Sequence, residues 1–300
     1  MKKLLSVGLM SIAVLGLAVG SDAHEPPGEL LVAVNFPDGS TPMIDGNSSD
    51  WSAVPLDQYG IFSETLFSIH GFAGENVDRG GLDASSMQIR HIIGWNDAAN
   101  SLYFTSRVYD NIHVTQRVDA GRFYWDDSWE VEVNAQHQAQ DDLNPGDDAT
   151  NFSYKFAFPV YLETFEWYRP NRNLPWLTSG SQWLDVAADH TGDEFGESTY
   201  DYELRVTPIS SMPKSEEATE GQVNIHDLSE GEVIHVTMTV NDVDGGDGDD
   251  DNRIGMWSTN PISCCHAGQD LLLTPIDPNI DWGAATAVEE SSWAKIKAQF

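Results

Sequence analysis

Short segments in which apolar and polar residues alternate are the feature that most constrains the fold of this chain. In the segment 101–110, SLYFTSRVYD, Leu102, Phe104 and Val108 fall on one side and Arg107 falls on the other. Successive side chains of a β-strand point to opposite faces, so such a segment has one apolar face and one polar face. Gly, Asn, Asp and Pro separate these segments, and helical periodicity is nearly absent. We therefore predict an all-β fold, an antiparallel β-sandwich of the jelly-roll type.

Further segments repeat the alternation and predict the remaining strands. They are 87–97, 128–134, 151–160, 199–206 and 232–242. Their polar positions include Glu130, Glu132, Lys155 and His235, in addition to Arg107. If these strands are neighbours, the polar positions form a sheet surface that can hold a hydrophilic ligand. The alternative is an ordinary solvated outer face, which antiparallel sheets commonly have.

The chain begins with the features of a secretory signal peptide. Lys2 and Lys3 precede the apolar run Leu4–Val19, and small residues follow up to Ala23. This pattern predicts cleavage near Ala23 and a secreted protein, located in the periplasm, at the cell surface or outside the cell. We expect one sandwich domain over residues 24–280. Two segments depart from the strand pattern: an irregular, aromatic-rich insertion at about 160–198, and a tail at 281–300 that can form a short helix.

Charge and cysteine content exclude several classes of partner. The chain has 48 acidic and 15 basic residues, which gives a formal net charge of −33. Such a surface repels nucleic acid and anionic membranes, and no later segment is apolar enough to predict membrane insertion. The two cysteines are adjacent, Cys264 and Cys265, so the chain carries no disulfide framework and their redox state stays open. Other secreted or cell-surface proteins remain conceivable partners.

An acidic stretch, VNDVDGGDGDDDNRIGMWS, occupies residues 240–258. Oxygen ligands on a flexible, glycine-rich loop suit calcium, which is the one cofactor we expect, in a structural role. The candidate calcium ligands are Asp242, Asp244, Asp247, Asp249 and Asp251. The stretch does not follow the EF-hand register, because Gly246 takes the fifth position and Asp247 takes the sixth, where glycine is required. The alternative is a solvated, enlarged turn between two paired strands.

Several motifs follow one another in an order that resembles a known family. They are TPMIDGNSSDWS (41–52), IRHIIGWNDAANSLYFTSRVYDN (89–111), FYWDDSWEVEVN (123–134), SYKFAF (153–158), YDYELRV (200–206) and VNDVD followed by RIGMWS (240–258). Over roughly residues 41–275 the chain resembles the family 9 carbohydrate-binding modules and the wider DOMON-like superfamily of sugar- and haem-binding sandwiches. The resemblance implies a non-catalytic module that holds a sugar between aromatic side chains. It also implies calcium ions that brace the fold in some members.

The resemblance also implies which residues bind the sugar. The first aromatic of that family precedes the Asp-Ser-x-Glu motif, which here places it at Tyr124, beside Trp125. Glu130 closes the motif, and Lys155 matches the basic residue of the following strand. A second aromatic is expected after Trp257, but the segment STNPISCCHAGQD contains none, so Trp257 or the tryptophans of the insertion would supply it. The predicted carbohydrate site therefore comprises Tyr124, Trp125, Arg107, Glu130, Lys155 and Trp257.

Three other functions stay open at this point. A DOMON-like haem or electron-transfer domain would need an axial ligand such as His235, Met238 or Met256. A structural surface protein would keep the sandwich and lack ligand binding. A glycosidase would use Glu130 and Glu132, roughly 6–7 Å apart on one strand face, but a chain so rich in acidic residues produces such pairs by chance. We predict no enzymatic activity and a carbohydrate or polysaccharide ligand, whose identity the sequence does not specify.

Overall fold

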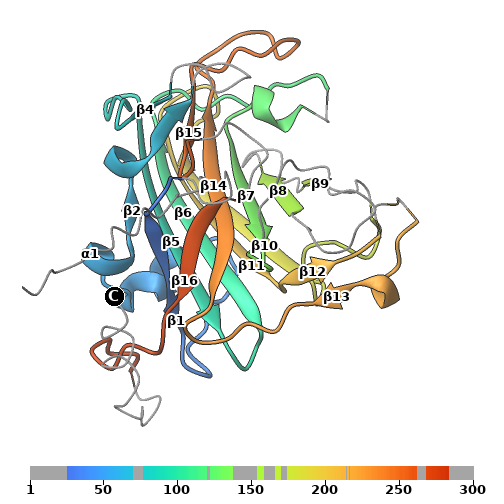
Figure 1. Cartoon of the computed structure of the whole chain (residues 1–300). Helices are drawn as coiled ribbons and strands as arrows, with labels where there is room; N and C mark the ends of the chain where they lie inside the picture. The colour runs from blue at the N-terminus through green and yellow to red at the C-terminus, as the bar shows by residue number, and fades with distance from the viewer. Residues whose placement is uncertain are drawn as a thin grey trace, which may run out of the picture.

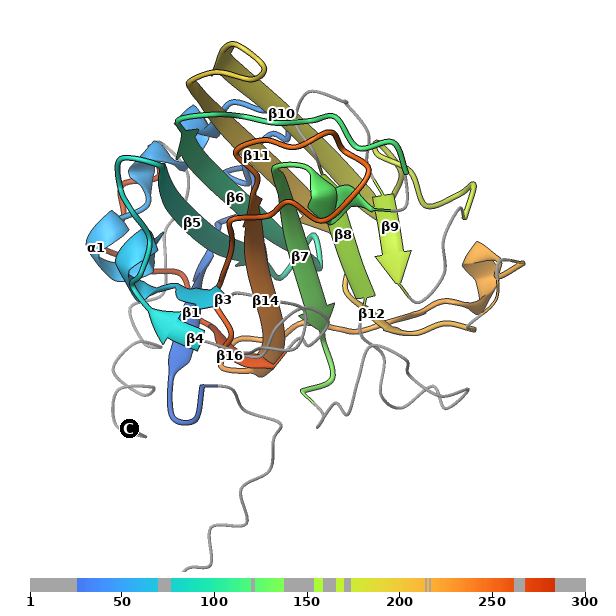
Figure 2. The same ribbon diagram turned by 90° about the horizontal axis from the view of Figure 1, so that it is seen from above.

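The computed structural model describes residues 26–69, 77–119, 122–137, 154–158, 166–169, 174–213, 215, 217–261 and 268–283. These residues form an all-β sandwich of two layers, as predicted (Figures 1 and 2). The predicted signal peptide, Cys264 and Cys265, and nearly all of the tail 281–300 lie outside the described residues. Among the described residues, no helix has the length and apolarity needed to cross a lipid bilayer.

One layer, here called the β6 sheet, is built around the strand predicted at 101–110. Its antiparallel strands, in spatial order, are β10 (Leu184–Gly192), β11 (Ser198–Val206), β6 (Ser101–Asp110), β5 (Met87–Asn96) and β2 (Ile61–Phe62). The edge strand β10 lies inside the segment that we predicted to be irregular. That prediction was wrong because β10 is mostly exposed and carries small and polar residues, so it has no apolar alternation.

The other layer, here called the β14 sheet, contains the remaining long strands. One half runs β9 (Glu166–Arg169), β8 (Tyr154–Phe158), β7 (Ser128–Asn134) and β14 (Val233–Asp242). The far edge of β14 pairs with both β16 (Gln269–Leu273) and β15 (Gly255–Ser258), and β15 continues to β3 (Phe67–Ile69) and β4 (Val77–Arg79). The strand β1 (Leu30–Asn35) joins the layers, because its first half pairs in parallel with β16 and its second half with β5.

Short elements complete the fold. They are the 3-10 helices η1 (Ser48–Ala53), η2 (Ser63–Thr65), η3 (Phe123–Trp125) and η4 (Glu220–Gln222), the helix α1 (Leu56–Tyr59), and the hairpin of β12 (Ile209–Ser211) and β13 (Asn224–Ile225). Of these, η1 and η3 matter most for the candidate sites, because they lie against opposite sheets.

The main core lies between the two sheets and confirms the predicted alternation. Leu102 and Phe104 of β6, and Trp129 and Val131 of β7, are fully buried in it. Trp129 stacks on Tyr202 of the opposite sheet, with ring centroids 5.4 Å apart. Burial of each such side chain contributes about 1.5–3 kcal/mol to the free energy of folding. The alternate residues of the same strands are therefore left for the two outer faces.

A second, smaller core covers part of the outer face of the β6 sheet. Trp51 of η1 packs edge-to-face on Phe36, and its Nε1 donates to Glu203 Oε1 at 2.8 Å. The backbone N–H groups of Asp45 and Gly46 donate to the other oxygen of the same carboxylate. Gly46 has a φ of +85°, and a Cβ there would lie 2.7 Å from a backbone carbon of β10. The Asp-Gly and Trp motif thus fastens the N-terminal segment onto the β6 sheet.

Candidate functional site

The helix η3 carries three consecutive aromatic residues into β7. Phe123 and Tyr124 are buried, and Trp125 is partly exposed. Their rings pack edge-to-face, with centroids 5.5 Å apart for the first pair and 6.3 Å apart for Tyr124 and Trp125. The guanidinium of Arg122 lies 5.6 Å from the centroid of the Trp125 ring. Tyr124 and Trp125 therefore form a packed pair of aromatic side chains at one end of the β14 sheet. We call this pair the aromatic step.

Arg253 connects this aromatic step to the polar face of the sheet. Its guanidinium lies 4.8 Å from the centroid of the Tyr124 ring, and its Nη1 donates to Asn241 Oδ1 at 3.1 Å. Asn241 Nδ2 in turn donates to Glu130 Oε1 at 2.6 Å. We call Tyr124, Trp125, Arg253, Asn241 and Glu130 the aromatic–arginine cluster. It unites three of the six residues predicted to bind carbohydrate, and it adds two that sequence reasoning missed.

The outer face of the β14 sheet is polar, as the alternation predicts, and it is buried. Its side chains include Glu130, Glu132, His235, Thr237, Thr239 and Asn241, none of them more than 4% exposed. They hydrogen-bond along the face, for example from Thr239 Oγ1 to Ser258 Oγ at 3.1 Å. Lys155 of β8 is in register with Glu132 of β7, so the predicted basic residue belongs to the strand beside the site.

Arg107 and Trp257 lie elsewhere, which corrects their place in the predicted site. Arg107 projects from the outer face of the β6 sheet, where it pairs with Asp201 at 2.5 Å, and the main core separates it from Glu130. Trp257 is in register with Val240 and packs in the main core. Two tryptophans of the insertion, Trp176 and Trp183, do not replace it, because they pack on each other and on the main core.

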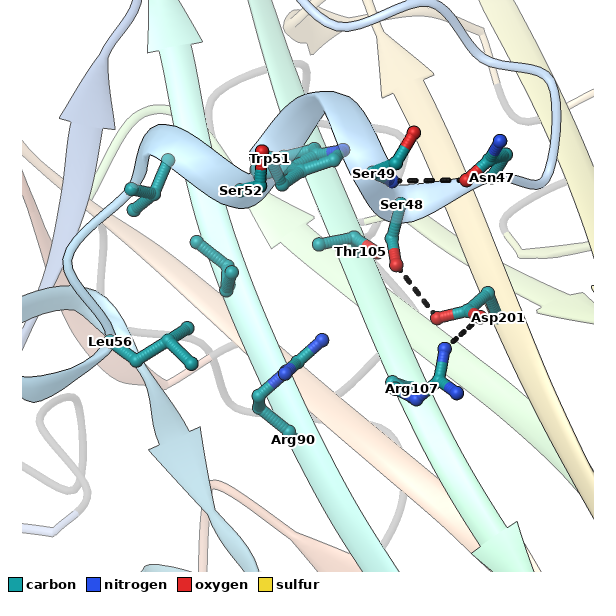
Figure 3. Close-up of a pocket in the computed structure, with 12 residues that line it drawn as sticks. Asn47, Ser48, Ser49, Trp51, Ser52, Leu56, Arg90, Thr105, Arg107 and Asp201 are labelled. Atoms are coloured by element: carbon teal, nitrogen blue, oxygen red, sulfur yellow. Dashed lines mark hydrogen bonds and ion pairs between the residues drawn. The ribbon is translucent and has the colours of Figure 1, made fainter. Parts of the chain in front are cut away.

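Arg107 instead borders a pocket on the outer face of the β6 sheet (Figure 3). The pocket has a volume of about 460 Å³ and lies between η1 and the strands β5, β6 and β11. Ser48 and Arg107 both bind the carboxylate of Asp201. Arg90 is directly opposite Arg107 in register, and among the described residues it has no hydrogen bond or ion pair. Burial, and then the charge of Arg107, lowers the pKa of Arg90.

A buried carboxylate cluster lies where the two sheets meet. It consists of Asp110 at the end of β6, Asp127 just before β7, Asp242 at the end of β14, and Asp244. The first three are at most 1% exposed. The carboxylate oxygens of Asp110, Asp242 and Asp244 lie within 4.8 Å of one another. Asp110, Asp127 and His113 also form such a group, with one carboxylate oxygen from each aspartate and one ring nitrogen from His113.

Hydrogen bonds and burial distinguish the members of this cluster. Asp127 accepts two backbone N–H bonds, from Val114 at 2.5 Å and from Val243 at 2.6 Å. Burial raises the pKa of Asp127 well above its usual range, and the charges of Asp110 and Asp242 raise it further. Burial, Asp110 and Asp244 raise the pKa of Asp242 to about 7. Burial and mutual repulsion thus disfavour the ionised form of these carboxyl groups.

The other three predicted calcium ligands lie apart from this cluster. Asp247, Asp249 and Asp251 are exposed on the loop between β14 and β15. Asp251 pairs with Arg253 at 2.7 Å. Asp247 and Asp249 share a hydrogen bond, which lowers the pKa of Asp247 and raises that of Asp249. We call these three residues the acidic hairpin. The predicted ligand set is therefore divided between a buried site and a solvent-exposed turn.

Two histidines and an aspartate lie close together at the other end of β14. His235 Nε2 and His137 Nε2 lie 3.1 Å and 3.3 Å from Asp270 Oδ1. Met238, the second haem-ligand candidate, faces the main core, whereas His235 faces outward. Because the two side chains leave opposite faces of β14, they cannot bind one iron together.

Comparisons with known proteins identify similar strand arrangements at low sequence identity. No protein-family model matches the chain, and no curated protein matches it. Two similar solved structures are of a family 9 carbohydrate-binding module from Caldicellulosiruptor kristjanssonii, one with glucose and one with cellotriose. They are 14% and 13% identical to this chain, with TM-scores of 0.48 and 0.46. They cover 84% and 87% of this chain, and 100% of each module.

Proposed function

We propose that this protein is a secreted, non-catalytic carbohydrate-binding protein whose ligand binds at the aromatic–arginine cluster. The observation that carries the proposal is the partly exposed side chain of Trp125, which packs on Tyr124, while the Tyr124 ring in turn contacts the guanidinium of Arg253. A pyranose has apolar C–H faces and a rim of hydroxyl groups, so it binds best where an aromatic face borders hydrogen-bonding side chains. Secretion is proposed on the signal peptide pattern alone.

The geometry of Glu130 and Glu132 supports a binding role rather than a catalytic one. Both side chains are no more than 2% exposed, and Glu130 is held by Asn241. A glycosidase needs two carboxyl groups on either side of a bound glycosidic bond, with room for the sugar between them. These two lie side by side on one buried strand face instead. Their positions therefore do not bracket a bound glycosidic bond.

The pocket in Figure 3 is a second candidate site for the same class of ligand. It is open, it is lined by the hydroxyl groups of Ser48, Ser49 and Thr105, and Arg90 lies at its edge. A ligand there would face the β6 sheet, whereas one at the aromatic–arginine cluster would face the β14 sheet. Single substitutions can therefore separate the two sites.

Binding is tested with the purified chain against glucose, cellotriose and a panel of insoluble polysaccharides. We expect binding to at least one probe. Trp125→Ala should weaken it about tenfold or more, which corresponds to ~1.4 kcal/mol, because an aromatic contact is lost. Trp282→Ala is the matched control, since Trp282 is also half-buried but packs on Phe36 in the second core.

Two arginine variants assign the site. Arg253→Ala should weaken binding, and Arg107→Ala should not, although each arginine pairs with one surface aspartate. Loss of binding in Arg107→Ala and Arg90→Ala alone would move the ligand to the pocket on the β6 sheet. Failure of the wild-type chain to bind any probe would favour the alternative, a structural surface protein.

A further inference from the structure

Two imidazole nitrogens and one carboxylate oxygen converge near the start of β14, where β16 pairs with it (Figure 1). His137 Nε2, His235 Nε2 and Asp270 Oδ1 all lie within 4.8 Å of one another. We propose that these three residues bind one zinc ion. Among the described residues, three groups of metal-ligand side chains converge in this way, and this group is the one with two imidazole rings.

The sheet itself places His235 beside Asp270. His235 of β14 is directly opposite Asp270 of β16 in the antiparallel register. Directly opposed residues project their side chains from the same face of a sheet, with Cβ atoms about 4.5–5.5 Å apart. His235 Nε2 consequently lies 3.1 Å from Asp270 Oδ1 on the outer face of the β14 sheet.

His137 reaches the same face from the segment that follows β7. Asn134, the last residue of β7, is in register with His235. The side chain of Asn134 accepts the backbone N–H of Gln136 at 3.1 Å, which turns the chain at the end of the strand. His137 then has a φ of +49°, a left-handed conformation that histidine adopts more readily than most residues. Its ring lies beside that of His235, with centroids 4.3 Å apart, and its Nε2 lies 3.3 Å from Asp270 Oδ1.

The donor atoms and their spacing favour zinc. Zinc bonds to nitrogen and oxygen place two ligand atoms of a tetrahedral site roughly 3.3–3.5 Å apart, and the two nitrogen–oxygen distances here are close to that value. Calcium and magnesium select oxygen ligands, whereas imidazole suits zinc and its neighbours among the transition metals. Two hydrogen bonds from the imidazoles to one carboxylate oxygen are the alternative arrangement, which a metal titration separates from zinc binding.

The site is fixed on one side and open on the other. The side chain of His235 is 1% exposed, whereas those of His137 and Asp270 are 34% and 23% exposed. A zinc ion with three protein ligands keeps a fourth position for water, and the ion needs a path by which to enter. The buried imidazole therefore fixes the position of the ion, and the two more exposed side chains give it access from solvent.

This zinc site is separate from the aromatic–arginine cluster. Asn241 comes six residues after His235 on β14, which corresponds to roughly 20 Å along the strand. The inference therefore does not rest on the proposed carbohydrate binding. The ion would join three segments that are distant in sequence, namely the turn after β7, β14 and β16. It would stabilise the folded chain, because the unfolded chain does not hold the three ligands together.

Zinc binding is tested by titration calorimetry and thermal unfolding of the full chain after treatment with a chelator. We expect zinc chloride to bind at one site and to raise Tm by several degrees, and a large excess of calcium chloride should not displace it. His137→Ala should weaken zinc binding about tenfold or more, since removal of even an outer partner of a metal ligand has an effect of this size. His137 is partly exposed, so this variant should fold.

His226→Ala is the matched control and should keep wild-type zinc binding. His226 Nε2 also pairs with a carboxylate oxygen, Glu232 Oε1 at 2.7 Å, and its side chain is partly exposed, but it belongs to none of the converging groups. The double variant Cys264→Ser, Cys265→Ser controls for binding by the thiols and should also retain the site.

Cobalt reports on the coordination directly. Cobalt replaces zinc in protein sites, and its visible absorption is strong when it is tetrahedral and weak when it is octahedral. The wild-type chain should give the strong spectrum, and His137→Ala should lose it. The proposal is overturned if zinc does not bind, if His137→Ala binds zinc as tightly as the wild-type chain, or if binding is lost with the two thiols.

Discussion

The buried carboxylate cluster and the acidic hairpin are both made of aspartates, but they differ in burial and in hydrogen bonding. Asp242 and Asp244 lie only a few residues before Asp247, yet Asp242 is buried and Asp247 is exposed. Oxygens of the cluster converge without partners, whereas the hairpin satisfies its carboxylates locally, with Arg253 and with one another. The comparison teaches that a dense run of aspartates marks a solvated turn. The aspartates whose oxygens converge come instead from separate strand ends that the fold brings together.

The largest expected difference between the two regions concerns Asp127. Asp127→Ala removes the acceptor of two buried backbone N–H groups, those of Val114 and Val243. Each buried donor left without a partner costs about 1–3 kcal/mol. We therefore expect the free energy of unfolding to fall by about 2–6 kcal/mol in a urea titration. Asp249→Ala is the control and should change it by less than about 0.5 kcal/mol. Equal losses in the free energy of unfolding for the two variants would show that the buried carboxylate cluster stabilises the fold no more than the acidic hairpin does.

A smaller difference is expected in the pH dependence of stability without divalent ions. The pKa of Asp242 is about 7 in the folded chain, compared with an ordinary value of 3.8. Between these values the folded chain holds a proton that the unfolded chain has released, so the free energy of unfolding falls as pH rises. Titration of Asp242 alone should lower the free energy of unfolding by on the order of a few kcal/mol over this range.

Unfolding midpoints measured in chelator between pH 4 and pH 8 check this expectation. Asp242→Asn should flatten the slope over this range, because the amide does not titrate. The triple hairpin variant should keep the wild-type slope. A wild-type chain whose stability rises across this range would contradict the raised pKa of Asp242.

The smallest expected effect is that of the hairpin ion pair. Asp251→Asn removes the partner of Arg253 on the exposed side, and such surface pairs contribute about 0–1 kcal/mol. We expect a change in the free energy of unfolding within this range, further reduced in 1 M salt by screening. A loss well above 1 kcal/mol that persists in high salt would mean that the hairpin supports the fold as strongly as the cluster does.

Local alternation predicted the strands and the core, but it did not predict which strands share a sheet. The segments around Leu102, Trp129 and Val236 behave as expected, because the side-chain period of a strand is a local property. Arg107 and Glu130 were placed on one surface although β6 and β7 belong to different layers. Sheet membership depends on pairing between distant segments, which alternation does not encode.

Two of the four residues of the buried carboxylate cluster were predicted from the sequence. The other two were missed because contacts between distant segments are not encoded locally. Asp242 and Asp244 stand in a conspicuous acidic run, whereas Asp110 and Asp127 are isolated residues at strand ends far away in sequence. Only the antiparallel pairing of β14 with β7, and the packing of the two sheets, bring all four together. A sequence signal did exist in Asp127, which begins the Asp-Ser-x-Glu motif, but nothing local connects it to Asp110.

A crystal structure of the chain grown with calcium tests the central contrast most directly. The account predicts an anomalous peak between Asp110 and Asp242, with ligand oxygens at about 2.3–2.6 Å. The acidic hairpin should carry no such peak. A calcium ion bound by Asp247, Asp249 and Asp251, with none in the buried carboxylate cluster, would contradict it.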